Sequence, residues 1–182
     1  MPDVWLYENP EKVTFGTVGE PGSRVFLLQV KEGDSLVTIK LEKQQVKAIV
    51  EYLSKILATA ARPGHLAEDM DLEEPNDPLW SAGAIAALYE EDINKVFLVV
   101  QEFDPEAPPL DDAEDPIKII TNVAFEGISI RIVMSLEQSG ALAIVGKRLV
   151  ESGRPLCPLC SYPLNPDGHD CPKTNGYRPP KL

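Results

Sequence analysis

A switch in hydrophobic period occurs twice along this 182-residue chain, each time from a strand-like to a helix-like pattern. Residues 37–41 alternate apolar and polar side chains, which is typical of a half-buried strand. From Lys43 the apolar residues recur every three to four positions, which predicts an amphipathic helix over residues 43–60. A Pro-Gly pair at positions 63 and 64 follows the helix, as expected where a helix stops.

The second half of the chain follows the same order. Residues 95–101 (KVFLVVQ) closely resemble residues 24–30 (RVFLLQV). Ser135 and Gln138 have the spacing of an S-x-x-Q capping box, which predicts a helix from about residue 136 to 151. Further strands are expected at residues 4–7, 13–15, 82–89, 117–123 and 128–134.

These patterns predict an α+β fold with two β-rich repeats, each closed by one helix, in which both helices pack on antiparallel strands. The expected boundaries are a core over 1–154, with repeat one at about 1–62, an acidic connector at 63–79 and repeat two at about 80–154. The second helix contains Gly140 and Gly146, each of which costs about 1 kcal/mol relative to alanine. We therefore expect this helix to be buried against the sheet.

The net charge of −12 is concentrated in two segments. Residues 66–77 hold six acidic residues and residues 102–115 hold seven, and neither segment contains a lysine or arginine. The rest of the chain is close to neutral. Because such segments have little apolar surface to bury, we predict two solvated loops. Calcium binding is not favoured, because the spacing lacks the D-x-[DN]-x-[DN]-G pattern of a calcium loop.

The three cysteines and one of the two histidines lie close together near the C-terminus. Cys157, Cys160, His169 and Cys171 have the spacing C-x2-C-x8-H-x-C, which fits a closed tetrahedral zinc site. The surrounding segment has few hydrophobic residues, so metal binding would supply much of its folding energy. The sequence predicts a zinc-ribbon-like tail over residues 155–182 that holds a structural Zn²⁺. Reduced cysteines without metal, or a redox or catalytic role, are the alternatives.

This tail (RPLCPLCSYPLNPDGHDCPKTNGY), together with VFLLQV and LEKQQVKAIVEYL upstream, resembles an uncharacterised bacterial family of conserved repeat proteins of unknown function. The resemblance covers essentially the whole chain, and the tail is its most specific part. It implies a cytosolic protein with two repeats and a Cys/His tail. It implies no catalytic residues.

The chain lacks the common catalytic motifs. With His169 assigned to the metal, His65 is the remaining histidine, and its position just after a helix stop predicts an exposed loop residue. The glycines do not have the spacing of a phosphate or dinucleotide loop, and no G-x-S-x-G is present. A closed four-ligand site leaves no position for a substrate. These absences favour a protein without catalytic activity, and the alternative is a carboxylate site that no motif identifies.

Three functions remain open. The first is a non-catalytic, zinc-containing adaptor that binds another protein. The second is a single-stranded nucleic-acid-binding protein, although the chain lacks the basic stripe and stacking aromatics of such proteins. The third is a hydrolase acting on a phosphorylated metabolite through carboxylates that no motif identifies. No apolar run is long enough to span a membrane, and the N-terminal residues do not resemble a signal peptide, so we expect a cytoplasmic protein.

Overall fold

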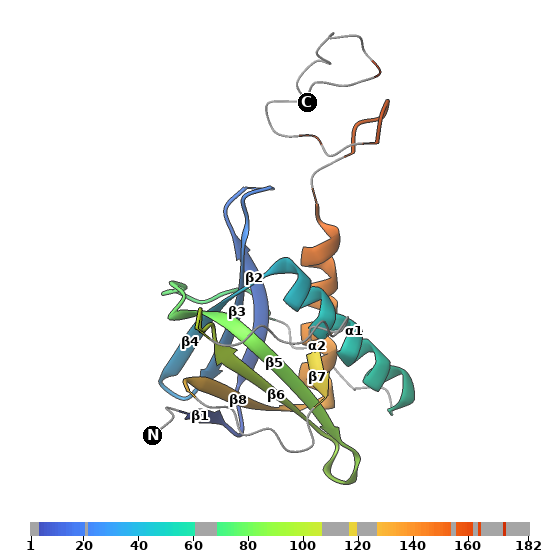
Figure 1. The fold of residues 1–182 in the computed structure, drawn as a ribbon. Coiled ribbons are helices and arrows are strands. Elements are labelled where there is room, and N and C mark those ends of the chain that lie inside the picture. The colour runs from blue at the N-terminus through green and yellow to red at the C-terminus, as the bar shows by residue number, and fades with distance from the viewer. Residues whose placement is uncertain are drawn as a thin grey trace.

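The structure is a computed structural model that describes residues 4–20, 22–60, 69–106, 117–119, 127–153, 156–161, 164 and 173. Eight strands and two α-helices form a mixed α+β core (Figure 1). The strands are β1 (Val4–Tyr7), β2 (Lys12–Val18), β3 (Val25–Glu32), β4 (Ser35–Leu41), β5 (Trp80–Glu90), β6 (Lys95–Glu102), β7 (Ile117–Ile119) and β8 (Ser129–Ser135). The helices are α1 (Lys43–Thr59), α2 (Leu136–Glu151) and the short 3-10 helix η1 (Glu91–Ile93).

Seven of the strands form one sheet in the order β1-β8-β6-β5-β4-β3-β2. The eighth strand, β7, also pairs with β5 but lies outside this order. Neighbours joined by a hairpin are antiparallel, but β1 and β8, β4 and β5, and β5 and β7 are parallel. The expectation of an antiparallel sheet is therefore wrong for three pairs. For β4 and β5 the reason is the connection through α1, because a helical crossover returns the chain in the same direction.

The sheet curls so strongly that strands distant in its order come into contact (Figure 1). Trp5 of β1 stacks on Trp80 of β5, with ring centroids 6.4 Å apart. The Tyr7 hydroxyl lies 2.7 Å from the hydroxyl of Ser35, at the start of β4. Right-handed twist accumulates along a sheet of this size and brings β1 close to β4 and β5, which are not its neighbours in the sheet.

Both helices lie on the same face of the curled sheet, and they pack against each other and on the core (Figure 1). The predicted burial of α2 is confirmed, because its residues 139–143 and Gly146 are buried. A Cβ atom on Gly146 would lie 2.5 Å from Val50 Cγ2 on α1 and 2.8 Å from Phe15 Cδ2 on β2. Only glycine permits this close approach.

The predicted helices are confirmed to within one residue at each end. The capping box is also present: Ser135 Oγ accepts a hydrogen bond from the Gln138 backbone N–H, and Gln138 Oε1 accepts one from the Ser135 N–H. Three strands followed by a helix occur twice, as β2-β3-β4-α1 and as β5-β6-β8-α2 with β7 added. The duplication of one unit stays a prediction, as do the domain boundaries.

Among the described elements, no helix is long and apolar enough to cross a membrane. Part of the second acidic segment, residues 107–115, lies outside the described residues, as do residues 120–123 of the strand expected at 117–123.

Candidate functional site

A row of buried polar side chains crosses three neighbouring strands. Thr14 on β2, Gln29 on β3 and Thr38 on β4 are in register and share one face of the sheet. Phe15, the neighbour of Thr14, contacts the helix layer, so this polar row is on the opposite face. The side-chain amide of Gln29 donates a hydrogen bond of 3.1 Å to Thr38 Oγ1. Such buried polar groups need partners, and the chain supplies more of them from the first acidic segment.

Residues 69–79, at the end of the acidic connector, lie across the polar row, and we call them the strap. The Thr14 hydroxyl donates to the Met70 carbonyl at 2.5 Å. Gln29 donates to the Glu73 carbonyl at 2.9 Å and accepts from the Glu73 N–H at 2.7 Å. The Leu79 N–H donates to the backbone carbonyl of Thr38 at 2.8 Å. Most residues of the strap are exposed, as expected for an acidic connector, but the sheet also binds the strap through its backbone.

Two lysines bind the acidic side chains of the strap. Lys31 Nζ lies 2.7 Å from Glu73 Oε2, and Lys12 Nζ lies 3.6 Å from Glu73 Oε1 and 3.4 Å from Asp69 Oδ2. The hydrogen bond from Lys31 holds the pKa of Glu73 below its ordinary value, and the same bond raises the pKa of Lys31. The pKa of Asp69 is lowered chiefly by a hydrogen bond from the Asp71 backbone and then by Lys12. These carboxylates serve as anchors for the strap.

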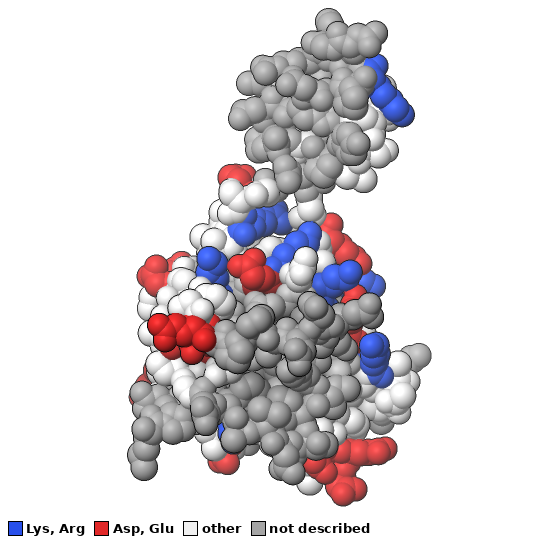
Figure 2. All heavy atoms as spheres, in the orientation of Figure 1, with Lys and Arg blue, Asp and Glu red and all other residues white. Residues whose placement is uncertain are grey.

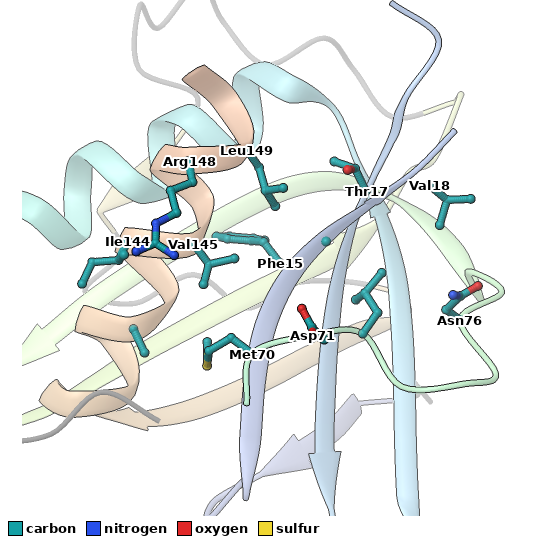
Figure 3. Close-up of a pocket in the computed structure, with 13 residues that line it drawn as sticks. Phe15, Thr17, Val18, Met70, Asp71, Asn76, Ile144, Val145, Arg148 and Leu149 are labelled. Atoms are coloured by element: carbon teal, nitrogen blue, oxygen red, sulfur yellow. The ribbon is translucent and has the colours of Figure 1, made fainter. Parts of the chain in front are cut away.

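A cavity of about 600 Å³ lies between the strap, β2 and α2 (Figure 3). On one side Ile144, Val145, Arg148 and Leu149 project from α2, and on the other Met70, Asp71, Leu72 and Asn76 belong to the strap. Residues 15–18 of β2 lie between these walls.

Gly16 allows the strap to approach β2 closely. A Cβ atom at this position would lie 2.3 Å from Leu72 Cγ, so any larger residue would displace the leucine side chain. Gly16 lies inside β2 and not in a turn. A glycine within a strand often marks such an approach, which is the signal that could have indicated a covering segment here.

The edge of the sheet runs along this cavity, because β2 is the last strand in the order. Glu32 and Ser35 flank the two-residue turn between β3 and β4, so they form a hydrogen-bonded pair. Along β3, successive residues direct their backbone N–H and C=O alternately to β4 and to β2. Counting back from Glu32, Leu27 bonds to β2, and its partner there is Gly16. The backbone groups of Phe15 and Thr17 therefore point away from the sheet. No other described residue forms a hydrogen bond with the outward N–H or C=O of Thr17.

The two charged residues that line the cavity have no ion-pair partner among the described residues. Arg148 and Asp71 lie on opposite walls, on α2 and the strap respectively. Lys147, the neighbour of Arg148, lies 4.0 Å from Glu151. The described lining contains one carboxylate and neither histidine nor cysteine. This combination of apolar walls, an open strand edge and two separated charges suits binding better than acid–base chemistry.

The described residues include two of the four predicted metal ligands. Cys157 is buried and Cys160 is half-buried, and they flank a turn closed by a 2.8 Å hydrogen bond from the Ser161 N–H to the Cys157 carbonyl. Ser161 has a positive φ of 62°, which lets the chain reverse directly after the second cysteine. A turn with two cysteines three residues apart fits half of a tetrahedral zinc site.

His169 and Cys171, the other two predicted ligands, lie outside the described residues, as does His65. Within the described part of the chain, no three potential ligands come together. The metal site therefore stays a prediction.

Comparison with known proteins identifies the family of this chain. The profile of the family described as "protein of unknown function (DUF3090)" matches residues 5–171, and the chain belongs to this family. No curated protein and no solved structure shows significant similarity to it. The resemblance to an uncharacterised family is thus confirmed.

Proposed function

We propose that this member of the family is a non-catalytic, zinc-containing adaptor that binds another protein in the bacterial cytoplasm. The observation that supports this most strongly is the cavity beside β2. An unprotected sheet edge exposes a row of backbone donors and acceptors, and natural proteins usually cover or blunt such edges. Here the pairing of β2 with β3 continues without interruption to Val18, and β2 contains no proline. The edge is therefore suited to contact another polypeptide.

The zinc tail would provide a second rigid element in this function. Cys157, Cys160, His169 and Cys171 would hold a structural Zn²⁺, which cross-links a segment that has little apolar surface of its own. The buried Cys157 and the turn at Ser161 support this assignment. With all four positions taken by protein, the metal would stabilise the tail without supplying a reaction site.

We also propose that the core arose from two repeats. The two strand-strand-strand-helix units support this, since β4 of the first lies beside β5 of the second. A shift of 95 residues aligns Leu41-Glu42 with Leu136-Glu137, at the start of each helix. Similar units in tandem are the usual result of duplication.

Nucleic-acid binding is a weaker second candidate. On the face shown in Figure 2, lysine and arginine side chains gather near the C-terminal end of α2, but acidic side chains lie between them. A single-strand binder instead needs a continuous basic groove with exposed aromatic platforms. Phe15 and Phe26, on adjacent strands, are both core residues. A phosphate-specific hydrolase has less support, because Arg148 is the only cation among the described residues that line the larger cavity.

Site-specific photocrosslinking in the full-length protein tests the adaptor function. A benzophenone amino acid at Ile144, on the wall of the cavity, should crosslink in cells to a defined protein that mass spectrometry identifies. The same group at Ile93, an exposed residue of η1, serves as the control and should not capture this protein. Crosslinks from Ile144 to nucleic acid, or to no macromolecule, would contradict the proposal.

A further inference from the structure

We propose that the cavity beside β2 binds an extended peptide segment of the partner, which adds as a strand to the sheet and places an acidic side chain against Arg148. This inference rests on the proposed binding function and specifies its site and ligand. Three features of the cavity lead to it: the direction of the β2 backbone groups, the two different walls, and the separated charges.

The backbone of β2 supplies the first feature. Thr17 directs its N–H and C=O away from β3, and Phe15 has the same orientation two residues earlier. Thr14 Oγ1 also lies 3.2 Å from the Phe15 carbonyl, but its single proton is donated chiefly to the closer Met70 carbonyl, so the Phe15 carbonyl stays available. A strand beside residues 15–18 would pair with these groups, as in other cases of strand addition.

The two walls supply the second feature. Successive side chains of an extended peptide point to opposite faces of the sheet. One set would therefore face α2, where Ile144 and Leu149 offer apolar contacts, and the other set would face Met70 and Leu72 of the strap (Figure 3). A compact small molecule, unlike an extended peptide, would not require a wall on each side of the strand edge.

The charges supply the third feature and define the peptide. Arg148 extends from α2 into the cavity and has no carboxylate partner among the described residues (Figure 3). A guanidinium group binds carboxylates through paired hydrogen bonds. Asp71 lies on the strap wall instead. The complementary peptide therefore carries an acidic residue on its α2-facing side and tolerates a basic one on its strap-facing side.

A second copy of this chain fits the edge less well. The strap contacts β2 at Thr14 through Met70, and Met70 lines this cavity as well as a smaller one around Lys12. The first half of β2 is thus covered, and only residues 15–18 adjoin the larger cavity. An antiparallel pair of full β2 strands would displace the strap, whereas a short peptide would not.

Fluorescence polarisation with designed peptides tests the inference on the full-length protein. The probes are eight-residue peptides of alternating valine and threonine. In each peptide one central valine is replaced by glutamate, glutamine or lysine, so that this residue lies on the same face as the remaining valines. We expect the glutamate peptide to bind about two- to fivefold more tightly than the glutamine peptide, and the lysine peptide to bind most weakly. N-methylation of alternate amides, which removes the backbone donors facing β2, should abolish binding.

Two charge reversals show whether Arg148 is responsible. Arg148→Glu should invert the order so that the lysine peptide binds best, whereas Lys147→Glu makes the same charge change outside the cavity lining and should preserve the order. An unchanged order in Arg148→Glu, or binding that survives N-methylation, would overturn the inference. So would a stable dimer in sedimentation that binds no peptide.

The two proposals fail differently. If photocrosslinking from Ile144 captures a defined protein but none of the peptides binds, strand addition is wrong and the adaptor function survives. If crosslinking captures no protein, the adaptor function fails as well.

Discussion

Gly146 lies where α2 crosses both α1 and β2, and its missing side chain determines how closely these elements approach. Gly146→Ala should gain about 1 kcal/mol of helix propensity but force a Cβ into Val50 and Phe15, and overpacking of this kind costs about 1–3 kcal/mol. Because Val50 is buried and β-branched, it has little room to move, and we expect a net loss of up to about 2 kcal/mol in the free energy of unfolding.

Urea unfolding measures this change. Gly153→Ala is the control, because a Cβ there meets nothing within 4 Å, and it should shift the free energy of unfolding by less than about 0.5 kcal/mol. Stabilisation by Gly146→Ala would show that the helices can move apart without cost.

Glu73 makes the attachment of the strap dependent on pH. Because its pKa is lower in the folded protein, its ionisation stabilises the fold above the unfolded pKa of glutamate, about 4.3, and this stabilisation is lost as the pH falls through the folded pKa. Lys31 acts in the opposite direction: its raised pKa stabilises the fold until the pH rises through that value.

We therefore expect the stability difference between wild type and Glu73→Gln to shrink as the pH falls below about 4.3. Urea unfolding at several pH values measures it. Glu51→Gln removes an exposed carboxylate 3.7 Å from Lys47 and should give a difference that is small at every pH. A constant difference between wild type and Glu73→Gln would contradict the role of this ion pair.

The attachment of the strap to the sheet is the feature that the sequence predicts least. The strap is acidic and poor in apolar residues, which is typical of a solvated loop. Its attachment instead depends on Gln29, a buried polar residue between the apolar residues Leu28 and Val30 of β3, 44 positions away from Glu73. A buried glutamine needs partners, so this residue was the available signal, although nothing nearby in the sequence identifies them.

Gln29→Met tests the attachment, because it keeps the approximate size of the side chain and removes its hydrogen bonds. The backbone N–H and C=O of Glu73 would then lose their partner, at a cost of about 1–3 kcal/mol. We expect faster hydrogen exchange over residues 69–79, measured by mass spectrometry. Gln44→Met, at an exposed position on α1, should leave exchange in the strap unchanged.

The helices, in contrast, followed closely from local pattern. The change of period at Lys43 and the capping box at Ser135 involve residues at most four positions apart, so neighbouring side chains determine them. Strand positions were also largely predictable from β-branched runs. Strand partners were not: parallel pairing of β4 with β5 depends on a connection of 38 residues between Leu41 and Trp80.

At the scale of the whole molecule, we expect metal removal to unfold the tail and to leave the core folded. We expect one zinc per chain by elemental analysis, and a lower zinc content in Cys157→Ser. Chelation should increase proteolysis within residues 155–182 while the core keeps its cooperative unfolding, because the hydrophobic core cluster is built from residues 7–143. Unfolding of the whole chain on chelation, or a metal-free wild type, would contradict the assignment of a structural zinc in the tail.

The sequence alone determined the class of fold, both helices, most strands and the four candidate metal ligands, because these depend on residues that are near one another in the chain. Only the tertiary structure placed Met70 on Thr14, 56 positions apart, and brought α2, β2 and the strap together around one cavity. Contacts at such separations depend on how the sheet curls and on which buried polar groups find partners. Neither can be predicted from residues that are near one another in the sequence, and the candidate binding site depends on both.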